Sequence, residues 1–140
     1  MAASNIRILV GYVIAGAGHR RAAEAVAAAA RQRWPQASVS CEDCLALRPS
    51  WWRNGYPVTY EWLVRRAPRL WAFGYWVLDR AWAVPLWRPL RRGWNRLIGR
   101  RFLRSIQSNP PDVIIVTHFF PADLLAAERS AGRLSSRLIV

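Results

Sequence analysis

Residues 6–20, IRILVGYVIAGAGHR, decide the fold of this chain. The stretch begins with a short run rich in β-branched side chains, residues 6–10, bounded by Asn5 and Gly11, which is typical of a buried strand. A loop of small residues follows and lets the backbone turn sharply. Residues 20–33 are rich in Ala and free of Gly and Pro, which predicts a helix that Pro35 stops. A strand, a tight loop and a helix indicate an α/β fold.

The rest of the frame repeats this alternation. Further strands are predicted over residues 38–41, 112–116 and 137–140, and a helix from Pro121 to about residue 130. Strands that alternate with helices form a parallel sheet with right-handed crossovers. The sequence stops inside the last apolar run, and domains rarely end on an unprotected strand. We therefore expect either a fragment whose sheet continues in further sequence or a truncated gene product.

Composition excludes several classes of protein. The chain has 140 residues, 53% of them apolar, which argues against intrinsic disorder, and only two Cys, which argues against a disulfide-stapled domain. No apolar run reaches the roughly 18 residues that span a bilayer. All 21 basic residues are Arg, and with eight acids the formal net charge is +13. Such a chain needs an acidic partner: nucleic acid, an anionic membrane or an acidic small molecule.

The charge is concentrated in one insert, about residues 48–109. The insert holds 13 Arg and two acids, a net +11, whereas the remainder holds eight Arg and six acids, a net +2. Eight of the nine Trp also lie there. Pro57, Pro68, Pro85 and Pro89 predict that the insert is divided into short helices of roughly 10 to 18 residues, and Gly93 and Gly99 weaken the case for a long continuous one.

Within the insert, Arg recurs every four residues from position 88 to position 104, opposite a mostly apolar side. Trp and Arg together suit the lipid–water interface, because indole has an apolar body with a polar N–H and guanidinium can bind phosphate through two hydrogen bonds. The plainer interpretation, core Trp and solvated Arg, fits any single Trp. Eight Trp in one basic segment favour interface binding.

The loop before the first helix carries the most chemistry. It is neither a Walker A loop nor a complete G-x-G-x-x-G motif, because Arg21 stands where the third Gly belongs. The helix N-terminus would stabilise a phosphate or a developing anion. His19 is placed between the carboxyl end of a strand and the start of a helix, where open α/β sheets bind ligands. A lone His is usually structural, but at this place an imidazole is a candidate general base.

A second His follows another strand. His118 comes just after the strand at 112–116, so both histidines are predicted on the same rim of the sheet, with a capping or core role for His118 left open. Asp123 and Glu128 are interpreted as ordinary first-turn and surface acids. Residues 41–44 have C-x-x-C spacing, but neither a zinc site nor a redox motif fits the context, and free thiols are expected.

Several of these stretches resemble one family. Residues 8–10, 16–19 and 22–25 look like the opening of the monogalactosyldiacylglycerol synthases and the processive bacterial diacylglycerol glucosyltransferases. Later pieces agree in order and spacing: Tyr60, residues 67–68, Trp71, Tyr75, and the Pro-Asp and Thr-His pairs of residues 111–118. The resemblance covers nearly the whole chain, and its two motifs are specific only together. The peptidoglycan enzyme that adds N-acetylglucosamine to a lipid-linked sugar has a similar Gly-rich loop ending in His.

The resemblance implies a fold and an activity. Residues 1–140 would be the Rossmann-like N-terminal half of a GT-B glycosyltransferase of the family-28 type, which binds acceptor and membrane, and the C-terminal nucleotide-sugar domain would be absent. The whole enzyme would move a hexose from UDP-glucose or UDP-galactose to diacylglycerol in glycolipid biosynthesis. It would act peripherally at the cytoplasmic face of the cell membrane, on anionic lipids, without cofactor or metal. The fragment alone is expected to be inactive.

The resemblance also assigns residues. His19 would be the catalytic base, and Gly16, Ala17, Gly18 and Arg20 would form the loop beside the donor diphosphate and the acceptor. The lining of the acceptor site would include His118, Phe119 and Pro121. The insert would contact the membrane through Trp71, Trp76, Arg92, Trp94, Arg96 and Arg100.

Two alternatives remain. A nucleic-acid binder would use Arg for phosphates and Trp for base stacking, but it leaves the His in the Gly-rich loop unexplained. A membrane-peripheral domain that has lost activity would keep the membrane-binding surface but would no longer catalyse the transfer. Nucleic acid is not the partner that we expect.

Overall fold

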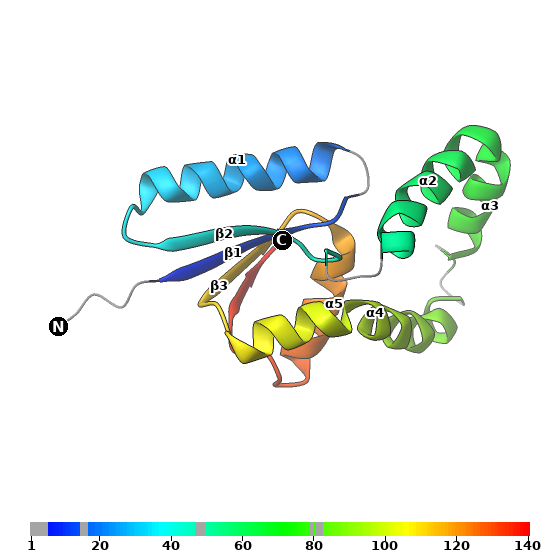
Figure 1. The fold of residues 1–140 in the computed structure, drawn as a ribbon. Coiled ribbons are helices and arrows are strands. Elements are labelled where there is room, and N and C mark those ends of the chain that lie inside the picture. Colours follow the sequence, from blue (N-terminus) through cyan, green and yellow to red (C-terminus); the bar gives the residue numbers. More distant parts are fainter. Residues whose placement is uncertain (1–5, 15–16, 47–49, 79, 81–82) are drawn as a thin grey trace.

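The computed structural model of the chain describes residues 6–14, 17–46, 50–78, 80 and 83–140 (Figure 1). The elements are, in order, β1 (Arg7–Tyr12), α1 (Ala17–Arg33), β2 (Ser38–Asp43), α2 (Ser50–Arg66), α3 (Pro68–Leu78), α4 (Ala83–Ser108), β3 (Val113–Val116), α5 (Phe119–Ser130) and β4 (Arg137–Ile139). The predicted alternation of strands and helices, interrupted by a helical insert, is confirmed.

The four strands form one parallel sheet in the order β2-β1-β3-β4. Leu9 of β1 lies between Ser40 on one side and Ile114 on the other. The chain leaves β1 toward β2 on one side and later returns to β3 on the other, so the strand order reverses between β1 and β3. In open α/β sheets the carboxyl edge at this point is where ligands bind.

Helices cover both faces of the sheet (Figure 1). Alternate side chains of β1 point to opposite faces, so Ile8 and Val10 pack against the alanines of α1, while Leu9 belongs to the core shared with α4 and α5. The Ala-rich sequence of α1 allows a close approach to the sheet. The larger core residues lie on the other face: Phe102, Leu103, Ile106, Phe120, Leu124 and Leu125.

The helix lengths predicted for the insert are wrong at α4. This helix runs for 26 residues, through Pro89, Gly93 and Gly99. Pro89 removes one backbone hydrogen bond near the exposed beginning of the helix, while the later turns bury Phe102 and Ile106 against the sheet. Tertiary packing of that second half therefore overrides the local breakers. The helix α2 likewise continues through position 57.

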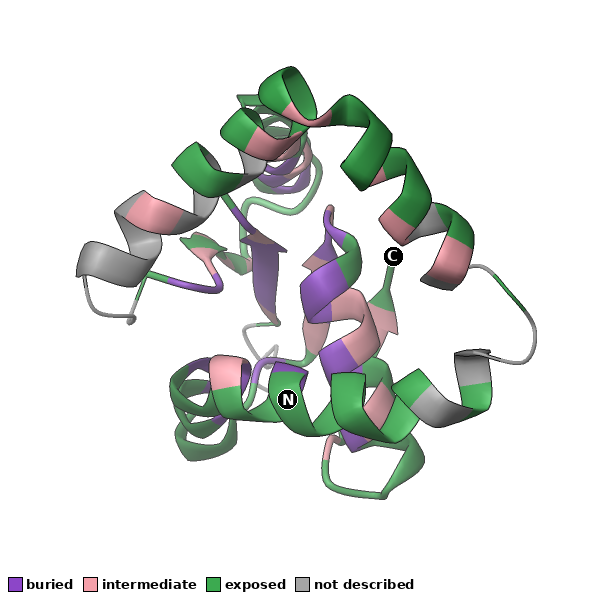
Figure 2. Cartoon of the chain, turned by 90° about the vertical axis from the view of Figure 1, so that its right-hand side faces the viewer, coloured by how far each residue is buried: buried purple, intermediate pink, exposed green. Residues whose placement is uncertain are grey.

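The first half of the insert stands apart from the sheet. The helices α2 and α3 lie side by side and extend beyond the end of the α/β frame (Figure 1). Figure 2 shows that buried residues gather on the sheet and on the helix surfaces that face it, whereas the outer helices are mostly exposed. No helix within the described ranges combines the length and the hydropathy that crossing a membrane requires.

Candidate functional site

His19 lies in the first turn of α1, not ahead of the helix. The predicted start at residue 20 is wrong by three residues, because α1 begins at Ala17. Two contacts with Thr117 hold this turn: the Thr117 hydroxyl donates to the His19 backbone carbonyl at 3.0 Å, and His19 Nδ1 lies 2.6 Å from the Thr117 carbonyl oxygen. The first turn is thus fixed to the residue that follows β3.

The contact at Nδ1 decides which nitrogen of His19 carries the proton. A backbone carbonyl only accepts hydrogen bonds, so Nδ1 of His19 donates to Thr117. The neutral ring therefore has its lone pair on Nε2. This is the protonation state that a general base requires. Thr117 was missed as a functional residue from the sequence, although it stands directly before His118 in the Thr-His pair.

His118 caps the helix that follows it. Its backbone is extended, with φ −138° and ψ 143°, and its Nδ1 accepts a hydrogen bond from the Phe120 N–H at 3.1 Å. The side chain is buried, and this burial, with a smaller contribution from neighbouring His19, lowers the pKa of His118 to about 4. The capping role that the sequence left open is present, and His118 is neutral at pH 7.

The two histidines meet at the edge of the sheet, as predicted. Their ring centroids are 4.6 Å apart at an interplanar angle of 76°. The parallel pairing of β1 with β3 explains the contact, because Gly11 lies opposite Val116 and both strands end at the same edge. Phe119 stacks on the His118 ring at 4.4 Å. The rim of the sheet thus carries two imidazoles and an aromatic ring that is 70% exposed.

An apolar pocket of about 230 Å³ is lined in part by Phe119, the residue that stacks on His118. Its lining comes from the ends of β1 and β2, the middle of α4 and the start of α5: Val13, Leu45, Trp94, Asn95, Ile98, Phe119 and Phe120. Small-molecule sites combine such apolar walls with a few polar groups. Of the predicted acceptor-site residues, Phe119 lines the pocket, the His118 ring contacts both Phe119 and His19, and Pro121 is buried in the first turn of α5.

The predicted phosphate loop is only partly described. Gly16 lies outside the described residues, while Ala17 and Gly18 open α1, so their backbone N–H groups point out of the helix start. A Cβ on Gly18 would meet nothing within 4 Å, which leaves open space at this position. Arg20 is exposed and forms a surface ion pair with Glu24 at 3.4 Å. The helix start therefore offers amide donors to an anion.

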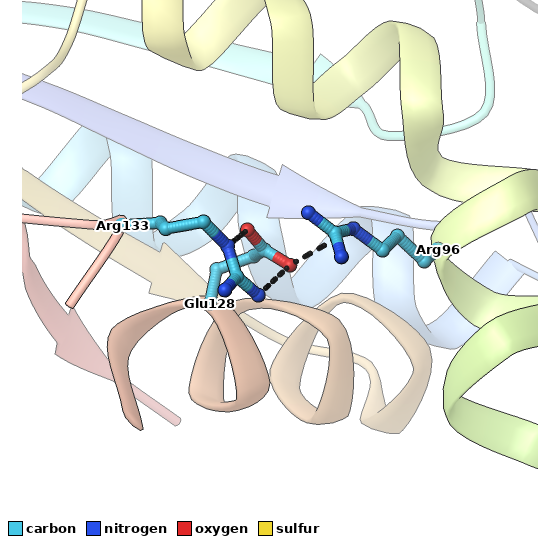
Figure 3. Close-up of polar contacts among 3 residues, drawn as sticks. All are labelled: Arg96, Glu128 and Arg133. Carbon is cyan, nitrogen blue, oxygen red and sulfur yellow. Dashed lines mark hydrogen bonds and ion pairs between the residues drawn. The ribbon is translucent and has the colours of Figure 1, made fainter. Parts of the chain in front are cut away.

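Glu128 and Asp123 were wrongly interpreted as ordinary first-turn and surface acids. Glu128 is 3% exposed, and its two oxygens bind Arg133 at 2.7 and 3.0 Å and approach Arg96 at 3.4 Å (Figure 3). The hydrogen bonds to Arg133 lower the pKa of Glu128. Asp123 binds Arg91 at 3.0 Å and the buried Asn95 at 2.8 Å. Both acids therefore link α5 to α4, and Glu128 also links α5 to the turn that follows it.

The insert exposes large apolar side chains next to arginines. Trp76 is 54% exposed, with the Arg80 guanidinium 4.2 Å from its ring centroid, and Phe73 stacks on it. On α4, Leu90, Trp94 and Leu97 are also 53–62% exposed. Among the predicted membrane residues, Arg92 and Arg100 are exposed, Trp71 is half-buried, and Arg96 reaches Glu128.

The cysteines are free thiols. Cys41 is half-buried on β2 and Cys44 is buried. Burial raises the pKa of both thiols, which keeps them protonated at pH 7. Across the part of the chain that the structure describes, there is no group of three or more His, Cys, Asp or Glu side chains able to hold a metal ion.

Comparison with known proteins gives one result. None of the curated proteins and none of the solved structures matches the chain. The model of one protein family, described as monogalactosyldiacylglycerol (MGDG) synthase, matches residues 19–140. The matched region begins at His19 and includes the insert, the Thr-His pair and α5. Because it spans well over half of the chain, the protein belongs to the MGDG synthase family of glycolipid glycosyltransferases, which act on diacylglycerol.

Proposed function

We propose that this chain is the acceptor-binding half of a peripheral membrane glycosyltransferase that moves a hexose from a UDP-sugar to diacylglycerol. The observation that carries the proposal is the hydrogen bond from His19 Nδ1 to the Thr117 carbonyl. It fixes the tautomer in which Nε2 can take a proton, at the sheet edge where ligands of such folds bind. The apolar pocket beside it suits the lipid end of the acceptor.

The reaction then needs one proton transfer and one displacement. The acceptor hydroxyl gives its proton to His19 Nε2, and its oxygen forms a bond to the anomeric carbon of the sugar. The bond from that carbon to the diphosphate oxygen breaks, and UDP leaves with the electron pair. The free N–H groups at the start of α1 are suited to the diphosphate. A second domain, outside these 140 residues, would hold most of the donor.

The membrane part of the proposal rests on the insert. Its exposed tryptophans and leucines lie among arginines, in a segment with 13 Arg and two acids. Apolar side chains enter the headgroup region while guanidinium groups bind lipid phosphate.

The apolar pocket limits how much of the lipid can enter the protein. Its volume is about 230 Å³, roughly that of seven or eight water molecules. Only the glycerol end and the first carbons of an acyl chain fit, so the chains would remain in the bilayer.

Sedimentation with vesicles tests the membrane part. Wild-type chain should sediment with vesicles of phosphatidylglycerol, phosphatidylcholine and diacylglycerol. Replacing Trp76 and Leu97 by Ser should weaken binding at least tenfold, since two large apolar contacts are lost. Trp34→Ser is the matched control, because Trp34 is 45% exposed but follows α1, outside the insert. Equal loss in both variants, or tight binding to single-stranded RNA without vesicle binding, would contradict the proposal.

A transfer assay tests whether the chain needs a second domain for catalysis. Because the donor would be held mainly by the second domain, the 140-residue chain should transfer no labelled hexose from UDP-glucose or UDP-galactose to diacylglycerol in the same vesicles. Measurable transfer by the isolated chain would overturn this part of the proposal and leave vesicle binding untouched.

A further inference from the structure

The two imidazoles are locked in opposite tautomers by the backbone. His19 donates from Nδ1 to the Thr117 carbonyl, which leaves a lone pair on Nε2. His118 accepts at Nδ1 from the Phe120 N–H, and the ring is neutral at pH 7, so its proton must be on Nε2. Each ring is thus anchored at Nδ1, and each Nε2 lies on the opposite side of its ring from that anchor.

The Nε2–H of His118 is a buried donor without a described use. His118 is 4% exposed, and within the ranges that the structure describes its hydrogen bond is the one at Nδ1. Buried polar groups almost always have a partner, so a native exception requires an explanation. The capping of α5 accounts for the hydrogen bond at Nδ1 but not for the burial of the Nε2–H group. The ring contact with His19, at 4.6 Å between centroids, places the ring that bears this donor against the ring of a candidate base.

We propose that His19 and His118 together bind one hydroxyl group of the acceptor lipid, at two points. The hydroxyl donates its hydrogen to Nε2 of His19, and its oxygen accepts a hydrogen bond from Nε2–H of His118. A hydroxyl group is both a donor and an acceptor, so it matches this pair of nitrogens. The inference rests on the proposed function and adds a direct contact for His118 with the reacting oxygen.

The second contact has a consequence for the chemistry. When His19 takes the proton, negative charge develops on the hydroxyl oxygen, and the hydrogen bond from His118 strengthens with that charge. His118 keeps its own proton throughout, and the proton that moves is the one from the hydroxyl to His19. Because His118 stays neutral, it adds no positive charge that would oppose protonation of His19.

Nitrogen-15 NMR tests the tautomers directly. The chain has two histidines, so uniform labelling of His gives two ring systems at pH 7. The His19 ring should show a protonated Nδ1 and an unprotonated Nε2, and the His118 ring the reverse, each assigned by the loss of its signals in a His→Asn variant. A protonated Nδ1 on His118 would overturn the proposal, since that ring would have no Nε2–H to offer.

Ligand binding tests the contact itself. The probes are 1,2-dioctanoylglycerol and its analogue in which hydrogen replaces the hydroxyl group. Wild-type chain should bind the hydroxyl lipid about tenfold more tightly, as expected for two neutral hydrogen bonds. His118→Asn should reduce this preference to about threefold. Asn is a preferred N-cap, so the variant should keep α5 capped while lacking the distant donor.

Controls separate this inference from the proposed function. Ile98→Ala trims a side chain that lines the pocket and should weaken binding of both lipids while the preference stays near tenfold. If His118→Asn unfolds, His118→Gln with the same pair of probes provides the second test. An unchanged preference in a folded His118 variant overturns the role of His118 alone. Binding of neither lipid by wild type, or equal binding of both, overturns the proposed acceptor site and this inference with it.

Discussion

Glu128 shows how one side chain joins several segments. The helix α5 ends in a turn in which Gly132 has a φ of +69°, the Gly132 N–H donates to the Arg129 carbonyl, and the Arg133 N–H donates to the Glu128 carbonyl. This is a Schellman motif, which needs a residue in the left-handed region and favours Gly. The turn folds Arg133 back over Glu128. In the sequence, this acid and this base are five positions apart, and residues at that spacing are not expected to contact each other on a regular helix.

Replacing this carboxylate should destabilise the fold. Glu128→Gln removes the charge that holds Arg133 and Arg96, and we expect a loss of about 2 kcal/mol in the free energy of unfolding, measured with urea. Glu61→Gln is the control, because Glu61 pairs with Arg65 on the exposed surface of α2, where such pairs contribute little. Equal, small effects of the two substitutions would show that the Glu128 contacts contribute no more than a surface pair.

His118 should make stability depend on pH. Its pKa is lowered to about 4 in the folded chain, against about 6.5 in the unfolded chain, so between these values the unfolded state binds more protons. Stability is therefore complete above about pH 6.5 and falls by about 1 kcal/mol per pH unit as the pH drops toward 4. Urea unfolding at pH 7, 6 and 5 measures this slope. His118→Asn should flatten it, and a slope that persists in that variant would assign it to other groups.

At the scale of elements, the sequence predicted the frame better than the insert. Short β-branched runs at β1 and β3 and the Ala-rich α1 are decided by local pattern, and the structure has them within a few residues. The length of α4 was wrong because local breakers predict an end, whereas burial of its second half against the sheet holds the helix together. Long-range packing of this kind leaves no local mark in the sequence.

Two glycines of α4 should respond oppositely to Ala. Gly99 is buried, and a Cβ there would overlap Leu124 of α5, so Gly99→Ala should destabilise the fold by about 1 to 3 kcal/mol. Gly93 is exposed with nothing within 4 Å, and Gly93→Ala should stabilise it by up to about 1 kcal/mol through helix propensity. Thermal unfolding followed by circular dichroism measures both. The same sign for the two variants would contradict the close packing of α4 on α5.

The candidate site could be predicted in position but not in detail. His19 and His118 both follow strands of a parallel sheet, and that topology alone places them on one rim. Their opposite tautomers depend on the Thr117 carbonyl and the Phe120 N–H, which are backbone groups present in every sequence. The role of Asn95, which binds Asp123 across two helices, likewise requires knowledge of how α4 packs on α5.

At the scale of the whole molecule, the frame carries the two histidines and the insert carries most of the net charge, so salt should separate two parts of the proposed membrane binding. Arginines near an anionic surface contribute about 1 kcal/mol each at low salt. Added salt limits the range of this attraction, which at 0.15 M is largely lost beyond about 8 Å. We expect binding to phosphatidylglycerol vesicles to weaken at least tenfold as NaCl is raised from about 0.05 M to about 0.5 M, and then to level off.

The binding that remains at high salt comes from exposed apolar side chains such as Trp76 and Leu97. Their transfer from water into the membrane is not weakened by salt. Sedimentation of the Trp76→Ser, Leu97→Ser variant should lack this plateau. A binder that only neutralises phosphates, as for nucleic acid, would instead lose affinity steadily on a log–log plot.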